Sequence, residues 1–319
     1  MTKSERLLRH IGHVSHFLAA ARDGNFRTAA RRLNISQSAI SKSVRILEDD
    51  FGVPLFERFP RGVALTTFGE ALFRRARVIE MECGYARLEI DGLRSGVAGV
   101  LRIAAGPVWG SSILPRAIGA LHAAHPNARF TIVRGPSAVS LPLLEKGEID
   151  VAIGALSSEM HTEAAYVSRP LLDIEMKVMA ADTHPLRHAA KIDVATLCDY
   201  PWVLFHQDDR VARRIRQFFE LRGLKHPNFV VNTESFLAVL ELLTSGPMLT
   251  CLAEPLLMIA RHHGVGIVPV QADIWRFRSG LTYRRSLEGL GLLEVLAVEL
   301  DRACREFRAR PDQREAPQQ

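Results

Sequence analysis

Two short amphipathic segments joined by a very short link are the feature that most constrains how this chain folds. Apolar residues recur at helical spacing in residues 26–33 and in residues 40–51, and the link at residues 33–36 leaves room only for a tight turn. Asn34 tolerates the left-handed backbone that such a turn requires, and Ser36 can cap the helix that follows. The spacing therefore predicts a helix-turn-helix motif.

We expect three helices in this part of the chain, each with one apolar stripe facing a common core. The first helix ends near Gly24, the second follows the cap residue Asn25, and the third ends at Gly52. The stripes are formed by Val14, Phe17, Leu18 and Ala21 in the first helix, by Phe26, Ala29, Ala30 and Leu33 in the second, and by Ile40, Val44, Leu47 and Phe51 in the third.

The outward face of the third helix is polar and cationic. Residues 1–66 hold eleven Lys and Arg against six Asp and Glu, a balance of +5, whereas the whole chain carries +6. A basic module of this kind is typical of proteins that bind a polyanion. In a DNA major groove, Gln pairs with adenine and Arg or Lys with guanine; an ordinary solvated helix face is the alternative. The side chains on this face are Gln37, Ser38, Ser41, Lys42 and Arg45.

Two short strand patterns follow the third helix. Residues 55–58 and 63–66 have strand character, and the turn residues 60–62 separate them. The pattern predicts a β-hairpin wing with Arg61 at its tip, where the guanidinium is able to reach a backbone phosphate or the minor groove. A surface arginine without a partner is the alternative.

Together these segments resemble the N-terminal domain of LysR-type transcriptional regulators. The resemblance rests on residues 26–48, on the wing residues 55–58, and on Leu65 and Thr66. It implies an all-α winged helix-turn-helix domain that binds double-stranded DNA. Ser38 stands where the family often has proline, and Lys42, a point charge, stands where a planar arginine is frequent. The contact candidates that the resemblance implies are Thr28, Gln37, Ser38, Ser41, Lys42, Arg45 and Arg61.

A long helical pattern follows the wing. Residues 67–70 have the spacing of a capping box, and the pattern stays helical as far as residues 92–96. Its apolar residues alternate spacings of three and four, as in a heptad repeat. We expect this helix to pair with the same helix of a second chain, which the resemblance also implies; packing onto the chain's own body is the alternative. The seam consists of Ala76, Ile79, Cys83, Ala86, Ile90 and Leu93.

The body of the chain alternates strand-like and helical patterns, which predicts a mostly parallel α/β architecture. The strands are too many for one compact sheet, and a break near Pro170 indicates two subdomains. The last strand and helix are expected to return to the first subdomain. The expected strands are residues 101–105, 130–134, 151–154, 176–181, 202–205, 229–232, 249–252, 266–270 and 278–284, and the expected helices are residues 113–124, 141–146, 211–222, 236–243, 254–263 and 290–307.

The body also resembles the effector-binding domain of the same regulators, through residues 99–106, 114–115, 144–154 and 184–186. The resemblance implies a two-subdomain fold similar to periplasmic binding proteins, with a ligand cleft between the subdomains. Residues 246–248 depart from the glycine-rich turn often found there. The expected division is a DNA-binding domain at 1–66, a linker and dimerisation helix at 67–96, an effector-binding domain at 97–308 with subdomain I at 97–170 and 275–308 and subdomain II at 171–274, and a disordered tail at 309–319.

A ligand of this fold would lie at strand ends and helix starts that face the cleft. Free N–H groups and hydroxyls at a helix start favour an anion such as a carboxylate, and aromatic side chains would add walls. We therefore expect a small carboxylate or aromatic metabolite, with ordinary caps and packing side chains as the alternative. The candidate residues are Trp109, Ser111, Ser112, Ser137, Phe205, His206, Thr233 and Glu234, with Ser235 beside them.

Other site types find little support. The four cysteines lie far apart without a C-x-x-C pair, so we expect reduced, mostly buried thiols and no zinc ribbon. His10, His13 and His16 share a helix face, but they lack neighbouring cysteine or carboxylate ligands, so no metal and no cofactor are expected. No phosphate loop or catalytic constellation occurs. A charged N-terminus and the absence of an 18-residue apolar run favour a cytoplasmic protein without a membrane span.

The combined interpretation is a sequence-specific DNA-binding transcriptional regulator, not an enzyme, that a small inducer controls. Expected partners are double-stranded DNA, the inducer, and further copies of the chain as a homodimer and homotetramer; RNA polymerase is a further candidate. Two competing classes stay open at this point. One is an α/β metabolite-binding enzyme with an attached DNA-binding module, and the other is an architectural DNA protein with a silent cleft.

Overall fold

The chain forms two compact units. The computed structural model describes residues 9–95, 99–135, 137–156, 165–205, 209–272 and 274–309. The first unit comprises residues 1–90 and the second residues 91–319, and each is described by itself. Among the described helices, none is both long enough and apolar enough to span a lipid bilayer. The prediction for the tail at 309–319 concerns residues outside this description, apart from Ala309, which ends the last helix.

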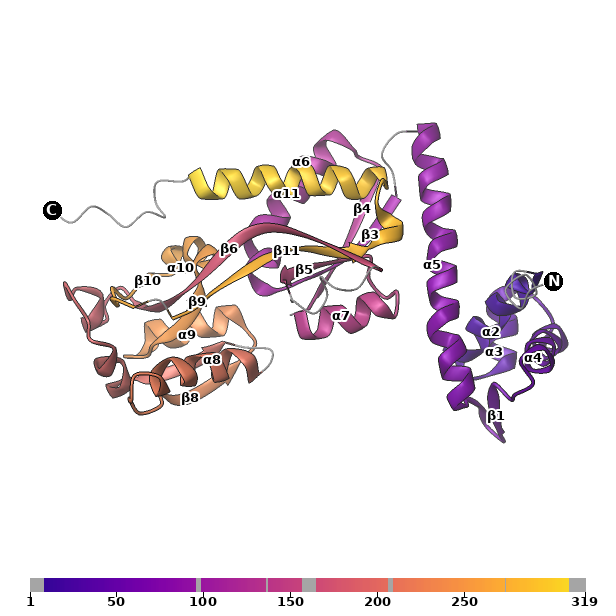
Figure 1. The fold of residues 1–319 in the computed structure, drawn as a ribbon, viewed down its shortest axis with the longest axis horizontal. Coiled ribbons are helices and arrows are strands. Elements are labelled where there is room, and N and C mark those ends of the chain that lie inside the picture. Colours follow the sequence, from indigo (N-terminus) through magenta and orange to yellow (C-terminus); the bar gives the residue numbers. More distant parts are fainter. Residues whose placement is uncertain are drawn as a thin grey trace. The chain divides into compact units, whose positions relative to one another are not determined.

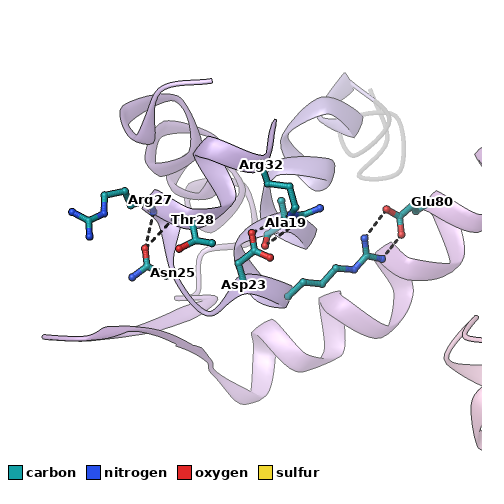
Figure 2. Close-up of polar contacts among 8 residues, drawn as sticks. Ala19, Asp23, Asn25, Arg27, Thr28, Arg32 and Glu80 are labelled. Carbon is teal, nitrogen blue, oxygen red and sulfur yellow. Dashed lines mark hydrogen bonds and ion pairs between the residues drawn. The ribbon is translucent and has the colours of Figure 1, made fainter. Parts of the chain in front are cut away.

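Three helices build the head of the first unit, as the apolar stripes predict. They are α2 (Ile11–Asp23), α3 (Phe26–Leu33) and α4 (Gln37–Phe51). Gly24 and Gly52 end α2 and α4 in the left-handed conformation. The Asn25 side chain accepts hydrogen bonds from the backbone N–H groups of Arg27 and Thr28, which caps α3 (Figure 2). The three predicted helices and their caps are confirmed.

The turn between α3 and α4 depends on one unusual backbone conformation. Asn34 has φ 55° and ψ 42°, and it is the only non-glycine residue with positive φ in the described part of the chain. Ser36 then caps α4 by accepting a hydrogen bond from the Ala39 N–H at 3.1 Å. The predicted inward position of Phe51 is wrong: its side chain is 43% exposed, because the last turn of α4 extends past the core that buries Leu47.

The wing and the start of the long helix follow in close succession. Strands β1 (Phe56–Phe59) and β2 (Gly62–Leu65) pair antiparallel around the tip. Helix α5 runs over Thr67–Ser95. Its cap is Thr66, whose hydroxyl accepts from the Gly69 N–H at 3.0 Å, so the capping box predicted from Thr67 is displaced by one residue. The cause is that the Thr66 hydroxyl also donates to the Pro54 carbonyl at 2.7 Å, which fixes it beside the wing.

The first turns of α5 are part of the head. Ala76 is fully buried in the same core as α2, α3 and α4, and Leu72 and Phe73 pack against that core. Arg22 of α2 forms an ion pair with Glu80 of α5, and Arg32 of α3 pairs with Asp23 at 3.1 Å (Figure 2). Farther along the predicted seam, Cys83, Ala86 and Ile90 are exposed.

The second unit is built on a seven-stranded mixed sheet in the order β10-β6-β11-β5-β3-β4, with β9 paired to β6 (Figure 1). A second, two-stranded parallel sheet pairs β7 with β8. The predicted strands all exist, although several boundaries shift. Their bounds are β3 (Gly99–Ala105), β4 (Ala128–Arg134), β5 (Val151–Ala155), β6 (Tyr166–Ala181), β7 (Pro201–Phe205), β8 (Asn228–Thr233), β9 (Thr250–Ala253), β10 (Val265–Ile267) and β11 (Arg276–Arg284).

The expectation of a mostly parallel architecture is wrong for the centre of this unit. Strands β3, β4 and β5 are parallel, but β11 pairs antiparallel with both β5 and β6, and β6 pairs antiparallel with β9 and β10. Pro170 does not break the chain between two subdomains. It lies inside the 16-residue strand β6, next to a register shift at Ser279 and Gly280 of β11. The strand predicted at residues 176–181 is therefore only the second half of β6.

Helices cover the sheet on both faces. Helices α6 and α11 pack against each other on one face of β3, β4 and β6, and α7 lies against β5 on the other (Figure 1). Near β7, α9 packs into a core of Val203, Leu240 and Leu252. The helices of this unit are η1 (Trp109–Ile113), α6 (Leu114–Ala124), α7 (Ser137–Glu145), η3 (Pro185–Arg187), η4 (Val194–Asp199), α8 (Asp209–Glu220), α9 (Phe236–Ser245), η5 (Glu254–Leu256), α10 (Leu257–His262), η6 (Arg285–Leu287) and α11 (Gly291–Ala309).

Candidate functional site

The candidate nucleic-acid interface is the outward face of α4. Ile40, Val44 and Leu47 are fully buried, which fixes the rotation of the helix about its axis. The opposite face carries Gln37, Ser38, Lys42 and Arg45, all exposed, and Ser41, which is half-buried. This face combines amide, hydroxyl and cationic donors over two turns of helix, which is the set that reads base edges in a major groove.

Two more contact candidates lie outside α4. Thr28 is exposed in the first turn of α3, where its backbone N–H is already held by Asn25. Arg61 is exposed in the two-residue tip between the paired residues Phe59 and Gly62 of the wing. All seven sequence-predicted residues therefore belong to the head, and each has at least part of its side chain in contact with solvent.

On the inner side of α4, two histidines share one buried hydroxyl. His13 Nδ1 lies 3.0 Å and His16 Nδ1 2.7 Å from Ser43 Oγ, and Ser43 itself is buried on α4. One hydroxyl donates only one proton, so one imidazole accepts from Ser43 while the other donates to it. Burial lowers the pKa of His13, and the neighbouring His10, His16 and Lys42 lower it further. No cluster of three metal-ligating side chains occurs among the described residues.

The pKa of His13 makes the stability of the head pH-dependent. Because the folded state lowers this pKa below its ordinary value of 6.5, the unfolded chain binds the proton more readily. The contribution of His13 to the free energy of unfolding is therefore fully present above pH 6.5. It decreases as the pH falls from that value toward the lower pKa of the folded state. Urea unfolding of the head between about pH 5 and pH 8 measures the effect. We expect His13→Gln to flatten this slope, and the exposed His122→Gln to leave it unchanged.

The second unit contains a cavity of about 310 Å³ at the carboxyl ends of several strands. Its wall includes residues at the ends of β3, β5, β7 and β9, together with residues of β6 and β11. The Trp109 indole N–H donates to Ser279 Oγ at 2.7 Å, which ties η1 to β11 across this wall. The lining residues are Gly106, Pro107, Val108, Trp109, Gly154, Ala155, Ile174, Met176, Phe205, Arg210, Val211, Arg214, Cys251, Leu252, Ala253, Leu256, Trp275, Arg276, Phe277 and Ser279.

Only some of the predicted effector residues reach this cavity. Trp109 and Phe205 line it. Ser111 is exposed elsewhere, and Ser112 is buried with its hydroxyl donating to the Val108 carbonyl at 2.6 Å. The Ser137 side chain and all of His206 lie outside the description.

The remaining candidates serve the local structure. The Thr233 hydroxyl accepts from the Ser235 N–H at 3.1 Å, and Ser235 caps α9. Glu234 is exposed and forms an ion pair with Arg134 of β4. The hydroxyls of Ser112, Thr233 and Ser235 thus bond to nearby backbone groups of their own chain segment in this arrangement.

The sequence reasoning missed the arginines of α8 and the aromatic residues before β11. Arg210 and Arg214 are four residues apart, so they share one face of the helix, and both line the cavity. Trp275 and Phe277 come from a segment far along the chain. A signal existed for α8, because residues 210–216 hold four arginines directly after a strand.

Family models match both parts of the chain described above. The family described as "Bacterial regulatory helix-turn-helix protein, lysR family" matches residues 11–70, and "LysR substrate binding domain" matches residues 94–305. A probable nitrogen assimilation transcriptional activator of Synechococcus elongatus is 31% identical over 77% of this chain and 79% of its own length.

Solved structures share the fold. Full-length OxyR from Pseudomonas aeruginosa has a TM-score of 0.67 and 24% identity over 91% of this chain and 94% of that one. Full-length CbnR, solved in complex with its target DNA, has a TM-score of 0.64 and 20% identity over 92% of this chain and 99% of that one. The chain belongs to the LysR family of transcriptional regulators and combines the helix-turn-helix domain of that family with its effector-binding domain.

Proposed function

We propose that α4 enters the major groove of a DNA operator and that Arg61 of the wing contacts the flanking backbone. The observation that supports this most directly is the exposed polar face of α4 on a helix whose rotation the core fixes. A related fold, that of CbnR, was solved with DNA bound. The proposed contact residues are Thr28, Gln37, Ser38, Ser41, Lys42, Arg45 and Arg61.

We further propose that the chain acts in the cytoplasm as a homodimer through α5, and that dimers pair into a homotetramer. The exposed Cys83, Ala86 and Ile90 form an apolar strip on α5 at the spacing of a heptad repeat, and a second α5 would cover it. The working division is 1–66, 67–96 and 97–308 for the DNA-binding, dimerisation and effector-binding parts. RNA polymerase is a proposed partner of the DNA-bound assembly.

In this proposal a small organic ligand occupies the cavity of the second unit and favours one arrangement of the assembly on DNA. A ligand shifts such an equilibrium only by the difference in its affinity for the two arrangements. The ligand must therefore change DNA binding measurably, whereas an enzyme would instead turn that ligand over.

The DNA contacts are tested by selecting fragments from a genomic library and titrating the retained site. We expect Arg45→Ala to cost about 1–3 kcal/mol at one base position and to relax specificity there. Arg61→Ala is expected to weaken all sequences alike and to reduce the salt slope by about 0.9 for each phosphate that the wing no longer touches. Wild-type binding by both variants would refute the contact assignment, and no preferential retention of any fragment would refute DNA recognition itself.

A further inference from the structure

We propose that Phe59, next to the tip of the wing, is a further DNA-contacting residue that enters the minor groove beside α4 and reads the deformability of one base step. This inference rests on the proposed function, since it requires α4 and Arg61 to lie on an operator. It adds an apolar contact to that interface and a preference at base pairs outside the reach of α4.

The Phe59 ring is exposed on the outer face of the wing. Side chains alternate between the two faces of a strand, and Phe56 of the same strand is buried in the core of the head. Arg58 lies on this inner face too, with its guanidinium carbon 5.7 Å from the centroid of the Phe26 ring. Phe59 therefore points away from the core, and it is 54% exposed.

The partner strand leaves the ring uncovered. Phe59 pairs with Gly62 across the hairpin, and glycine has no side chain that could pack on the ring. Arg61 lies in the turn beside it, so this end of the wing combines an exposed ring with an exposed cation. Such a pair fits a DNA groove, whose wall consists of deoxyribose carbons and phosphates.

The wing is fixed relative to α4, so both can lie on one duplex. The Glu48 carboxylate of α4 accepts hydrogen bonds from the Leu55 N–H at 2.8 Å and the Phe56 N–H at 3.3 Å. On the second strand, the Val63 N–H donates to the Gly24 carbonyl at 2.8 Å. A wing held in this way brings its tip to the groove next to α4 without the cost of ordering a flexible loop.

A minor groove accepts an apolar side chain more readily at some sequences than at others. The groove is about 6 Å wide, so it admits single side chains but not a helix. Apolar side chains that enter it separate neighbouring base pairs and kink the duplex. Pyrimidine–purine steps such as TA and CA deform most easily. Phe59 therefore favours these steps without a hydrogen bond to any base.

Glu57 limits how far the wing enters the groove. It shares the outer face with Phe59 and is exposed, and phosphates repel its carboxylate. A strand rises about 3.3 Å per residue, which places Glu57 roughly 7 Å behind Phe59, toward the base of the hairpin. Only the tip, from Phe59 to Arg61, therefore enters the groove.

The test uses the full-length protein and the operator retained from the genomic library, with its flanking base pairs randomised. Phe59→Thr removes the ring but keeps a high strand propensity. We expect the wild type to enrich TA or CA at one flanking step, and Phe59→Thr to lose that enrichment while keeping the preference under α4. On the enriched site Phe59→Thr should bind about ten-fold more weakly, because the exposed part of the ring is no longer removed from water.

The salt dependence of binding separates this contact from that of Arg61. An apolar contact releases no counterions, so Phe59→Thr should lose the same factor in affinity at every salt concentration and keep the wild-type salt slope. Arg61→Ala is expected to reduce that slope. Phe59→Leu retains an apolar side chain and should keep most of the affinity and the step preference.

Phe68→Thr is the matched control. Phe68 is 55% exposed in the same head, but it lies in the first turn of α5, which follows the base of the hairpin. This variant should bind every site like the wild type. Urea unfolding of each variant checks that the head stays folded.

Wild-type affinity, an unchanged preference at the flanking step, or a reduced salt slope in Phe59→Thr would each overturn the inference. A wild type that selects an operator while Phe59→Thr behaves identically contradicts only the role of Phe59. A wild type that prefers no fragment contradicts the proposed function, and this inference with it.

Discussion

Replacing Phe17 by alanine is expected to unfold the DNA-binding head while the second unit stays folded. The Phe17 ring is fully buried between α2, α4 and the wing, and its centroid lies 5.3 Å from that of Phe56. Removing a buried phenylalanine costs about 3–5 kcal/mol, which is comparable to the whole stability of a small domain. Calorimetry of the full chain should therefore show one transition fewer, and DNA binding should be abolished.

Phe51→Ala is the matched control for this experiment. It removes the same side chain from the same head, but at a position that is 43% exposed and outside the core. We expect it to cost less than about 1 kcal/mol. If Phe17→Ala also kept both transitions and bound DNA normally, the core of α2, α4 and the wing would not be what holds the head together.

Replacing Gly280 by alanine is expected to disrupt the centre of the second unit. A Cβ atom at this position would lie 2.1 Å from the Arg169 carbonyl oxygen and 3.0 Å from the Leu171 nitrogen. Both are backbone atoms of β6, so the two long strands must separate at their register shift. Strain of this size belongs to the most damaging class of substitutions, and we expect a loss of about 3 kcal/mol or more in urea unfolding of this unit.

Gly119→Ala is the control for that substitution. Gly119 lies in α6, and a Cβ built there would meet no atom within 4 Å apart from its chain neighbours and the backbone of its own helix. Alanine is a better helix former than glycine, so this change should stabilise the unit by about 0.5–1 kcal/mol. Similar unfolding curves for the two variants would mean that the contact between β6 and β11 at Gly280 is not tight in solution.

Local signals made the head predictable from the sequence. Asn25, Asn34 and Ser36 act on backbone groups two or three residues away, so their spacing alone indicates where α3 and α4 begin and end. The exposed face of α4 followed from the same periodicity. Phe51 was misplaced because periodicity gives the direction of a side chain but not how far the core extends along the helix.

The second unit was harder because its organising contacts are remote in sequence. Leu172 of β6 pairs with Ser279 of β11, more than a hundred residues later, and no short pattern encodes that register. The cavity has the same origin, since Trp109, Arg214 and Trp275 come from three distant segments. Hydroxyls at helix starts suggested ligand contacts, but Ser112 and Thr233 bond to their own backbone neighbourhoods instead.

Because Ala76 is buried in the core of the head, the start of α5 is packed as part of the head and is not a flexible linker. The exposed ion pair between Arg22 and Glu80 adds a weaker contact between α2 and α5 one turn further along. Because the first turns of α5 share the core that holds α4, we expect a rotation of this part of α5 to move α4 with it. In a regulator built this way, a small rotation of α5 would change the orientation of α4 relative to the DNA.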